Sequence, residues 1–173
     1  MYETDRLQLK HPVFSYWEGM YRNLWCHRES AEFMLWNVTT SPEEAQERMR
    51  RSIAFQEGKP AWFVYEKCSG EPMGFAGFRE IEPGVFEDTG IAVGPAFVGK
   101  GYGKEILNLL TRIAKEEYGA VGFIASCRSC GQKMRWYRRS DGTAKAPESE
   151  KKAEEENAFS FHMENGEIVM KSE

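Results

Sequence analysis

The chain of 173 residues and 19.9 kDa has the length of one domain, since domains run to roughly 100–200 residues. Apolar residues make up 41% of it and charged residues 29%, which excludes a wholly disordered or fibrous protein. The formal net charge of −4 opposes non-specific binding to nucleic acid or to anionic lipid. No uncharged apolar stretch approaches the roughly 20 residues that span a bilayer, so we expect no membrane helix and no membrane partner.

The amino terminus and the cysteines bear on the compartment. Residues 1–6 carry acidic side chains at once and lack the basic-then-apolar layout of a secretory signal. We therefore expect a cytoplasmic protein. Its cysteines are then expected to be reduced thiols rather than disulfide pairs: Cys26, Cys68, Cys127 and Cys130.

The first part of the chain predicts one short strand and two helical segments. Leu7 to Lys10 alternates in polarity like a strand, and the aromatic-rich stretch from Phe14 to Trp25 is compatible with a helix. Ser41 to Glu44 is a strong helix start, because Ser41 can cap, Pro42 suits the first turn and Glu44 completes a capping box. One face of that helix carries Ala45, Met49 and Ile53.

After Gly58 the polarity pattern changes from helical to strand-like. Strands are predicted at Trp62–Tyr65, Met73–Phe78 and Glu87–Val93, with a turn at Pro83-Gly84. Residues 103–118 predict an amphipathic helix. Its apolar stripe is formed by Ile106, Leu109, Leu110 and Ile113.

The last third of the chain predicts further strands around a charged loop. Val121 to Ala125 is read as a buried strand and Gly131 to Arg139 as a helix. Residues 144–157 hold eight charges in fourteen positions, so we expect a mobile loop there. Asn165-Gly166, flanked by alternating apolar residues, predicts a hairpin. This order of elements favours a mixed sheet with helices, an α+β (mixed α/β) protein.

The glycine-rich segment between residues 94 and 105 is the strongest functional signal. Glycines at positions 99, 101 and 103 leave backbone N–H groups free to close on an anion at a helix N-terminus, where Lys100 and Lys104 add positive charge. A phosphate-bearing ligand is the natural inference, and the alternative is a loop that merely needs unusual dihedral angles. Gly101 follows Lys100 where a P-loop requires Ser or Thr, and the even spacing fails the dinucleotide fingerprint.

These residues resemble a known family. Val98 to Gly103 is similar to the acyl-CoA pyrophosphate loop of the GNAT N-acetyltransferases, usually written Q/R-x-x-G-x-G/A, with Val98 in place of the usual Gln or Arg. The opening Glu3 to Leu9 and the segment Gly74 to Phe78 resemble the RimJ/RimL-like branch of that superfamily. The resemblance covers roughly residues 2–142.

The resemblance implies one acyl-CoA N-acyltransferase domain over residues 1–173. Its expected fold is a splayed, mostly antiparallel sheet of about seven strands flanked by about four helices, with two strands parting to admit pantetheine. Acetyl-CoA is the implied co-substrate, with no metal. The backbone of Ile91, Ala92 and Val93 is expected to pair with the pantetheine amides. The pyrophosphate is expected to contact Val98, Gly99, Lys100, Gly101, Tyr102, Gly103 and Lys104.

Acetylation of an amine needs proximity, removal of a proton and protonation of the departing thiolate. The resemblance implies Asp88 as the base, and the alternative is that Asp88 and its neighbour Glu87 are merely solvated acids. The general acid of the family is a Tyr in a helix. Arg138 aligns with it and Tyr137 precedes by one residue, about 100° around a helix. Tyr137 is thus either the acid or a core residue, and water would protonate the thiolate in the second case.

Three other patterns in the sequence bear on function. Cys127 and Cys130 form a C-x-x-C pair of the thioredoxin kind, which is either redox-active or incidental. The basic run from Arg128 to Arg139 is a site for the CoA 3′-phosphate, a site for nucleic acid or a solvated helix face. The aromatic residues Tyr16, Trp17, Tyr21 and Trp25 are expected to form core or the wall of a cleft for a cationic amine.

We therefore expect an N-acetyltransferase that moves acetyl directly from acetyl-CoA to a primary amine, either a protein N-terminus or a small molecule. The alternatives are a CoA-binding module without activity and a C-x-x-C dithiol redox protein. Nucleic acid is not an expected partner, and a homodimer is compatible with the sequence.

Overall fold

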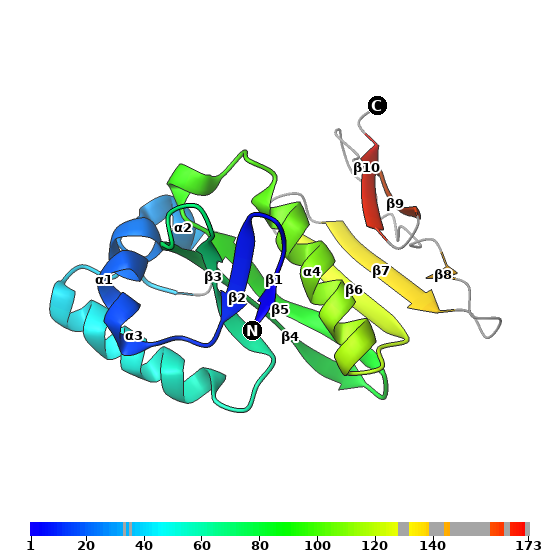
Figure 1. The fold of residues 1–173 in the computed structure, drawn as a ribbon, viewed down its shortest axis with the longest axis horizontal. Coiled ribbons are helices and arrows are strands. Elements are labelled where there is room, and N and C mark those ends of the chain that lie inside the picture. The colour runs from blue at the N-terminus through cyan, green and yellow to red at the C-terminus, as the bar shows by residue number, and fades with distance from the viewer. Residues whose placement is uncertain are drawn as a thin grey trace. The chain divides into compact units, whose positions relative to one another are not determined.

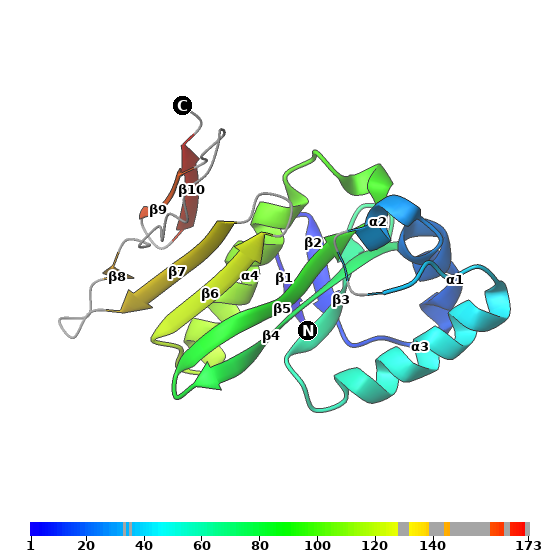
Figure 2. The ribbon, with the colours of Figure 1, turned by 180° about the vertical axis from the view of Figure 1, so that it is seen from behind.

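The computed structural model describes residues 1–32, 34, 36–127, 132–138, 144–145, 160–164 and 167–171. They form two compact units, the first made of residues 1–79 and 89–110 and the second of residues 80–88 and 111–173. Figure 1 and Figure 2 label the elements of both units from opposite sides. The single domain over residues 1–173 stays a prediction.

The first unit contains an antiparallel array of strands. Its strand order is β1-β2-β3-β4-β5, and β1/β2, β2/β3 and β3/β4 are antiparallel pairs. The bounds are Tyr2–Glu3 for β1, Leu7–Lys10 for β2, Ala61–Glu66 for β3, Pro72–Glu82 for β4 and Val85–Val93 for β5. The predicted strands and the turn at Gly84, whose φ is +74°, are confirmed.

The central strand of this array is buried on both faces. Trp62, Phe63, Val64 and Tyr65 of β3 are all buried. Because successive side chains of a strand point to opposite faces, Phe63 and Tyr65 join the cluster under the helices, while the Trp62 ring packs 5.7 Å from that of Phe78. The helix-side cluster contains Met20, Leu24, Trp25, Ala45, Met49, Phe63, Tyr65 and Ala92.

The first helical segment that covers this cluster changes from 3-10 to α to π winding along its length. The predicted helix over 14–25 is confirmed as three consecutive pieces, η1 (Phe14–Tyr16), α1 (Trp17–Met20) and the π-helical η2 (Tyr21–Trp25). α2 spans Arg28–Glu32. α3 spans Pro42–Gln56 and lies beside α1 in both ribbon views (Figure 1, Figure 2).

The start of α3 follows the sequence signal closely. The Glu44 amide donates to Ser41 Oγ at 3.2 Å, as the capping box predicts. The reciprocal bond comes from the Thr40 amide to Glu44 Oε2 at 2.7 Å, one residue earlier than expected. This backbone bond is the main cause that lowers the pKa of Glu44.

The predicted amphipathic helix over 103–118 is confirmed as α4, Tyr102–Glu117. Its residues up to Leu110 belong to the first unit and those from Thr111 to the second. The whole predicted stripe is buried, with Ile106 and Leu110 fully inaccessible.

The second unit has the strand order β4-β5-β6-β7-β8. β6 (Gly122–Cys127) pairs parallel with β5, while β7 (Gln132–Arg138) and β8 (Ala144–Lys145) continue antiparallel. The helix predicted over 131–139 is therefore wrong. Lys133-Met134-Arg135-Trp136 alternates in polarity, a strand signal, and bulky aromatic residues favour the pleated surface over a helix.

The carboxyl-terminal hairpin is confirmed. β9 (Ser160–Glu164) and β10 (Glu167–Lys171) pair antiparallel, with Met163 opposite Ile168. The charged loop predicted at 144–157 lies outside the described residues except for β8. The mixed α/β class is confirmed. The described residues place eight strands, β1 to β8, in the sheet order where about seven were expected, and two of these are only two residues long.

Gly94 offers a test of the packing between η2 and the end of β5. A Cβ at Gly94 would lie 1.8 Å from the carbonyl oxygen of Asn23, although its φ of −63° suits any residue. We expect Gly94→Ala to lower the free energy of unfolding by roughly 1–3 kcal/mol or more, since the backbone cannot yield without moving η2. Urea denaturation measures this.

The matched control is Gly103→Ala, because a Cβ at Gly103 meets nothing within 4 Å and Gly103 lies inside α4. Its stability should be unchanged or raised by up to about 1 kcal/mol. Equal stability of Gly94→Ala and the wild type would contradict the close packing.

Candidate active site

The candidate site is built where β5 ends and α4 begins. Gly90, inside β5, has a φ of +116°, a conformation that L residues rarely adopt, so the strand is kinked just before the predicted pantetheine segment 91–93. A Cβ at Gly74 of β4 would lie 2.0 Å from the Ala92 carbonyl oxygen, and the Gly94 amide donates to Met73 O at 2.8 Å. The segment is thereby held closely against β4.

The loop after β5 leaves several backbone amides without partners. η3 (Pro95–Phe97) ends in a bond from the Val98 amide to Pro95 O, and the next backbone donor is Glu105, which bonds Gly101 O at 3.2 Å. The amides of residues 99–104 make no hydrogen bond to any described residue. Gly99 and Gly101 have φ of +78° and +80°, which turns the loop into the first turn of α4.

The space over these amides is open. A Cβ added at Gly99 or Gly103 meets nothing within 4 Å, and Lys100 and Lys104 are exposed. Unbonded amides at a helix N-terminus attract an anion, and two lysines strengthen that attraction. The pyrophosphate of acetyl-CoA fits this arrangement, because it needs donors and space rather than a particular side chain.

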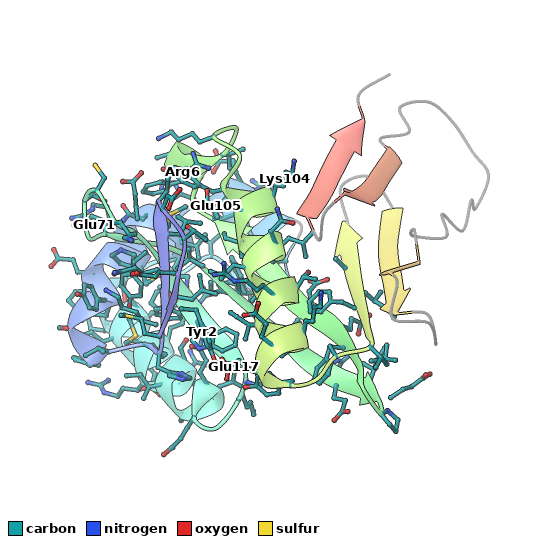
Figure 3. All side chains as sticks on the ribbon, turned by 45° about the vertical axis from the view of Figure 1, so that its right-hand side comes forward. Tyr2, Arg6, Glu71, Lys104, Glu105 and Glu117 are labelled. Atoms are coloured by element: carbon teal, nitrogen blue, oxygen red, sulfur yellow. The ribbon has the colours of Figure 1, made fainter. Side chains whose placement is uncertain are left out.

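An arginine from the amino terminus fastens the loop. Arg6 donates through Nε to Glu105 Oε2 at 2.8 Å and through a second nitrogen to the same carboxylate, and Figure 3 shows the two side chains together. Arg6 also donates to Lys100 O at 3.1 Å and lies 4.6 Å from the centre of the Tyr102 ring. Thr4 Oγ1 donates to the other oxygen of Glu105. We call this group of residues the Arg6 clamp.

Tyr102 is a second anchor of the same turn. Its hydroxyl donates to Glu66 Oε1 at 2.6 Å at the end of β3, and Tyr102 is buried. The bond raises the pKa of Tyr102 and lowers the pKa of Glu66, which is also held down by a bond from Ser69. The Tyr102 hydroxyl thus holds the loop to the sheet, and only the backbone of Tyr102 is left for a ligand.

The predicted base lies at the end of a strand ladder. Within the second unit, the parallel pairing of β5 with β6 covers Val85–Glu87 and stops at Glu87 opposite Ile124, although β6 continues to Cys127. Asp88 is the next residue of β5 and is half-buried. It lies where the two strands cease to pair.

Tyr137, the predicted acid, does not lie opposite Asp88, the predicted base, in the strand register. Tyr137 of β7 is opposite Gly122, which is opposite Val85, whereas Asp88 is three residues further along β5. Two strand spacings and three residues separate the backbones of Asp88 and Tyr137 by roughly 14 Å. Tyr137 lies in strand β7. The rotation of about 100° between Tyr137 and Arg138, which assumed a helix, therefore does not apply.

The cysteine pair does not have the expected context. Cys127 is the last residue of β6, Cys130 lies outside the described residues, and the element that follows is β7 rather than a helix. A thioredoxin-like strand, C-x-x-C and helix is therefore not formed. Among the described residues, no cluster of three His, Cys, Asp or Glu has a geometry suited to a metal ion.

The aromatic residues of the first helices are mainly core. Trp25 is only 1% exposed, and Tyr16, Trp17 and Tyr21 are partly buried against the same cluster. The Tyr16 and Tyr65 rings meet edge to face with centres 4.9 Å apart. Sequence reasoning missed the Arg6 clamp, for which the only signal was the Thr4-Asp5-Arg6 opening.

A comparison with protein families identifies the class of this fold and site. The model of the acetyltransferase (GNAT) domain matches residues 6–135, well over half of the chain. The chain belongs to the GNAT acetyltransferase family. It is an enzyme of the acyltransferase class, and acetyl-CoA is its acyl donor, as expected from the sequence.

Solved structures share the fold. A GNAT-family acetyltransferase from Bacillus anthracis is 18% identical, with a TM-score of 0.60 over 72% of each chain. RimL, a ribosomal L7/L12 alpha-N-protein acetyltransferase solved with coenzyme A, is 18% identical, with a TM-score of 0.57 over 76% of this chain and 72% of that one. A spermidine N-acetyltransferase from Vibrio cholerae, solved with CoA and spermine, is 15% identical, with a TM-score of 0.54 over 70% and 71%.

These likenesses concern the fold. No curated protein matches the chain significantly. Over the described residues, every helix is too short or too polar to cross a bilayer.

The bond between Tyr102 and Glu66 gives a prediction with a defined pH dependence. We expect Tyr102→Phe to lower the free energy of unfolding by about 1 kcal/mol at neutral pH. Because the bond lowers the folded-state pKa of Glu66, its contribution is present above the usual value of 4.5 and is lost as the pH falls through the folded-state pKa. The stability difference between the wild type and the variant should therefore shrink as the pH falls below 4.5 and through the lowered pKa of Glu66.

Urea denaturation at several pH values measures the difference. Glu66→Gln is the matched control, since its amide oxygen still accepts the bond without titrating. A gap between wild type and Tyr102→Phe that stays constant down to acid pH would contradict the role of Glu66.

Proposed function

We propose that the chain transfers acetyl directly from acetyl-CoA to a primary amine, with no covalent enzyme intermediate. The observation that carries the proposal is the row of unbonded amides at residues 99–104, held open by the Arg6 clamp and by Tyr102. Amides that the protein leaves unpaired are satisfied by water or by a ligand, and here they come from six consecutive residues.

The proposed binding mode follows the direction of the chain. The pyrophosphate lies against the amides of Gly99 to Lys104, with Lys100 and Lys104 beside it. The pantetheine follows the backbone of Ile91 to Val93 beyond the kink at Gly90. Asp88, which precedes Thr89 in β5, is the proposed base. The missing Gln or Arg at Val98 removes one side-chain contact but none of the amides.

In the proposed reaction the amine nitrogen attacks the thioester carbonyl carbon and the carbon–sulfur bond breaks. Asp88 takes a proton from the attacking amine, and the CoA thiolate leaves and is protonated by Tyr137 or by water. Binding the two substrates side by side supplies much of the acceleration. The separation of Asp88 and Tyr137 in the strand register favours water as the second proton donor.

The acceptor is proposed to be either a protein amino terminus or a small amine. Two of the similar folds are named for acceptors of these two kinds, RimL for a ribosomal protein and the Vibrio cholerae enzyme for spermidine. A binder without activity would share the CoA site but not the transfer. Release of CoA thiol from acetyl-CoA in the presence of an amine panel separates these two cases.

The cofactor loop is tested by Gly103→Asp, which adds a carboxylate at a position with open space and helical φ. We expect CoA affinity to fall by roughly 10- to 100-fold, because the carboxylate repels the pyrophosphate at short range. Gly103→Ala should retain most of the affinity, and titration calorimetry with CoA measures both. Undiminished binding by Gly103→Asp would refute the placement of the pyrophosphate.

The base is tested by Asp88→Asn. We expect kcat to fall by about 10²- to 10⁴-fold at neutral pH, with the KM for acetyl-CoA nearly unchanged, because only proton removal is lost. Glu87→Gln, the adjacent residue of the same strand, should keep its activity. Tyr137→Phe distinguishes the second proton donor, since a tenfold or larger loss of kcat would favour tyrosine over water. Full activity of Asp88→Asn would remove Asp88 from the mechanism.

A further inference from the structure

Arg48 of α3 is a cation that the packing partly removes from water. Its guanidinium carbon lies 4.9 Å from the centre of the Trp25 ring and 4.8 Å from that of the Trp36 ring. Burial is the main cause that lowers the pKa of Arg48, to about 10, with a further contribution from the positive charge of Arg51. A charge in such surroundings is costly unless an opposite charge accompanies it.

No described carboxylate forms a direct ion pair with Arg48, and Glu44, one turn earlier on α3, attracts its charge only from a longer distance. Arg48 donates through one terminal nitrogen to two neutral oxygens, Thr39 Oγ1 at 3.0 Å and Asn37 O at 3.3 Å. No described carboxylate lies within 4.0 Å of it, whereas Arg6, Arg22 and Arg50 each have one. Its nearest acid on the helix, Glu44, is bonded to the Thr40 amide instead.

The guanidinium nevertheless has donors to spare. The guanidinium has five N–H groups, and those on Nε and on the second terminal nitrogen have no partner among the described atoms. These two nitrogens are not among the described buried polar atoms that lack a partner, so they are accessible to solvent. All five donors lie in the guanidinium plane, so stacking against indole rings leaves them available. A planar fork of this kind matches the two oxygens of a carboxylate or a phosphate.

The position of Arg48 connects it with the strands of the proposed active site. The Trp36 ring packs on Phe75 of β4 with centres 5.2 Å apart. The Met34 methyl lies 3.0 Å from where a Cβ at Gly90 of β5 would be. The segment that holds Trp36 against Arg48 therefore also lies against the kink at Gly90, next to the proposed pantetheine segment.

We propose that Arg48 binds an anionic group, a carboxylate or a phosphate, carried by the amine acceptor. The proposal rests on the proposed acetyl transfer, and it names the acceptor as an acidic amine. It replaces the expectation of an aromatic cleft for a purely cationic amine, because a second cation beside Arg48 would be repelled. The amine nitrogen is directed toward the thioester while its acidic group remains on Arg48.

The first experiment compares amines that differ only in the anionic group. Phosphoethanolamine is paired with ethanolamine, β-alanine with its amide, and peptide amides that begin with Asp with those that begin with Asn. We expect kcat/KM to favour the acidic member of at least one pair by roughly 10- to 100-fold. The pair that shows the preference identifies the source as a phosphorylated amine, a small carboxylate or a peptide.

The variants assign that preference to one residue. Arg48→Met removes the charge at similar length and should abolish the preference, while Arg48→Lys should keep part of it. Arg51→Met is the matched control, because it removes the same charge from an exposed neighbour on the same helix and should leave the preference intact. No preference for any acidic member, or a preference that survives Arg48→Met, would overturn the proposal.

A binding experiment tests the Arg48 site separately from the proposed acetyl transfer. Inorganic phosphate is added to the protein saturated with CoA, so that the glycine loop is occupied. At several times its dissociation constant, phosphate should raise Tm by about 2–4 °C in the wild type and in Arg51→Met but not in Arg48→Met. Equal rises in all three would overturn the Arg48 site. Failure of CoA itself to stabilise the protein would overturn the proposed function and leave the phosphate comparison valid.

Discussion

The first turn of α4 has more backbone donors than the protein can satisfy, and the surrounding structure preserves this surplus. A helix N-terminus always leaves amides unbonded, and here the loop before it adds two more residues with no partner. The Arg6 clamp bonds to Glu105 and to the Lys100 carbonyl, so it fixes the turn without using any of its N–H groups. The Tyr102 hydroxyl also fixes the turn, by donating to Glu66, and it uses none of the backbone N–H groups either. The backbone donors of this turn are therefore left unoccupied by described acceptors of the protein.

Local signals in the sequence predicted most of the elements. The cap at Ser41 and the stripe of Ile106 and Leu110 depend on residues within one or two turns, so the pattern contains all the needed information. β7 was mistaken for a helix because its short alternation around Trp136 competes with a basic run that resembles a helix face. The partner that stabilises it, β6, acts through pairing, which no local window displays.

The candidate site was predictable only in its backbone part. The spacing of the glycines predicts the loop. Arg6 and Glu105, however, are 99 residues apart, and a single sequence does not show that they are in contact. The same holds for Arg48, whose two indole neighbours come from η2 and from the segment before α3. The distance between Asp88 and Tyr137 depends on the register of three strands, which sequence alignment to a family motif does not reveal.

The π-helical winding of Tyr21–Trp25 has a consequence for the aromatic neighbours of Arg48. A π turn holds one residue more than an α turn, so deleting one residue from it would restore regular winding and change the angular positions of the residues within the turn, Asn23 and Trp25 among them. Trp25 would then leave the guanidinium, and the Asn23 carbonyl would leave its seat against Gly94. One additional residue in this turn thus sets where the Trp25 ring and the Asn23 carbonyl lie.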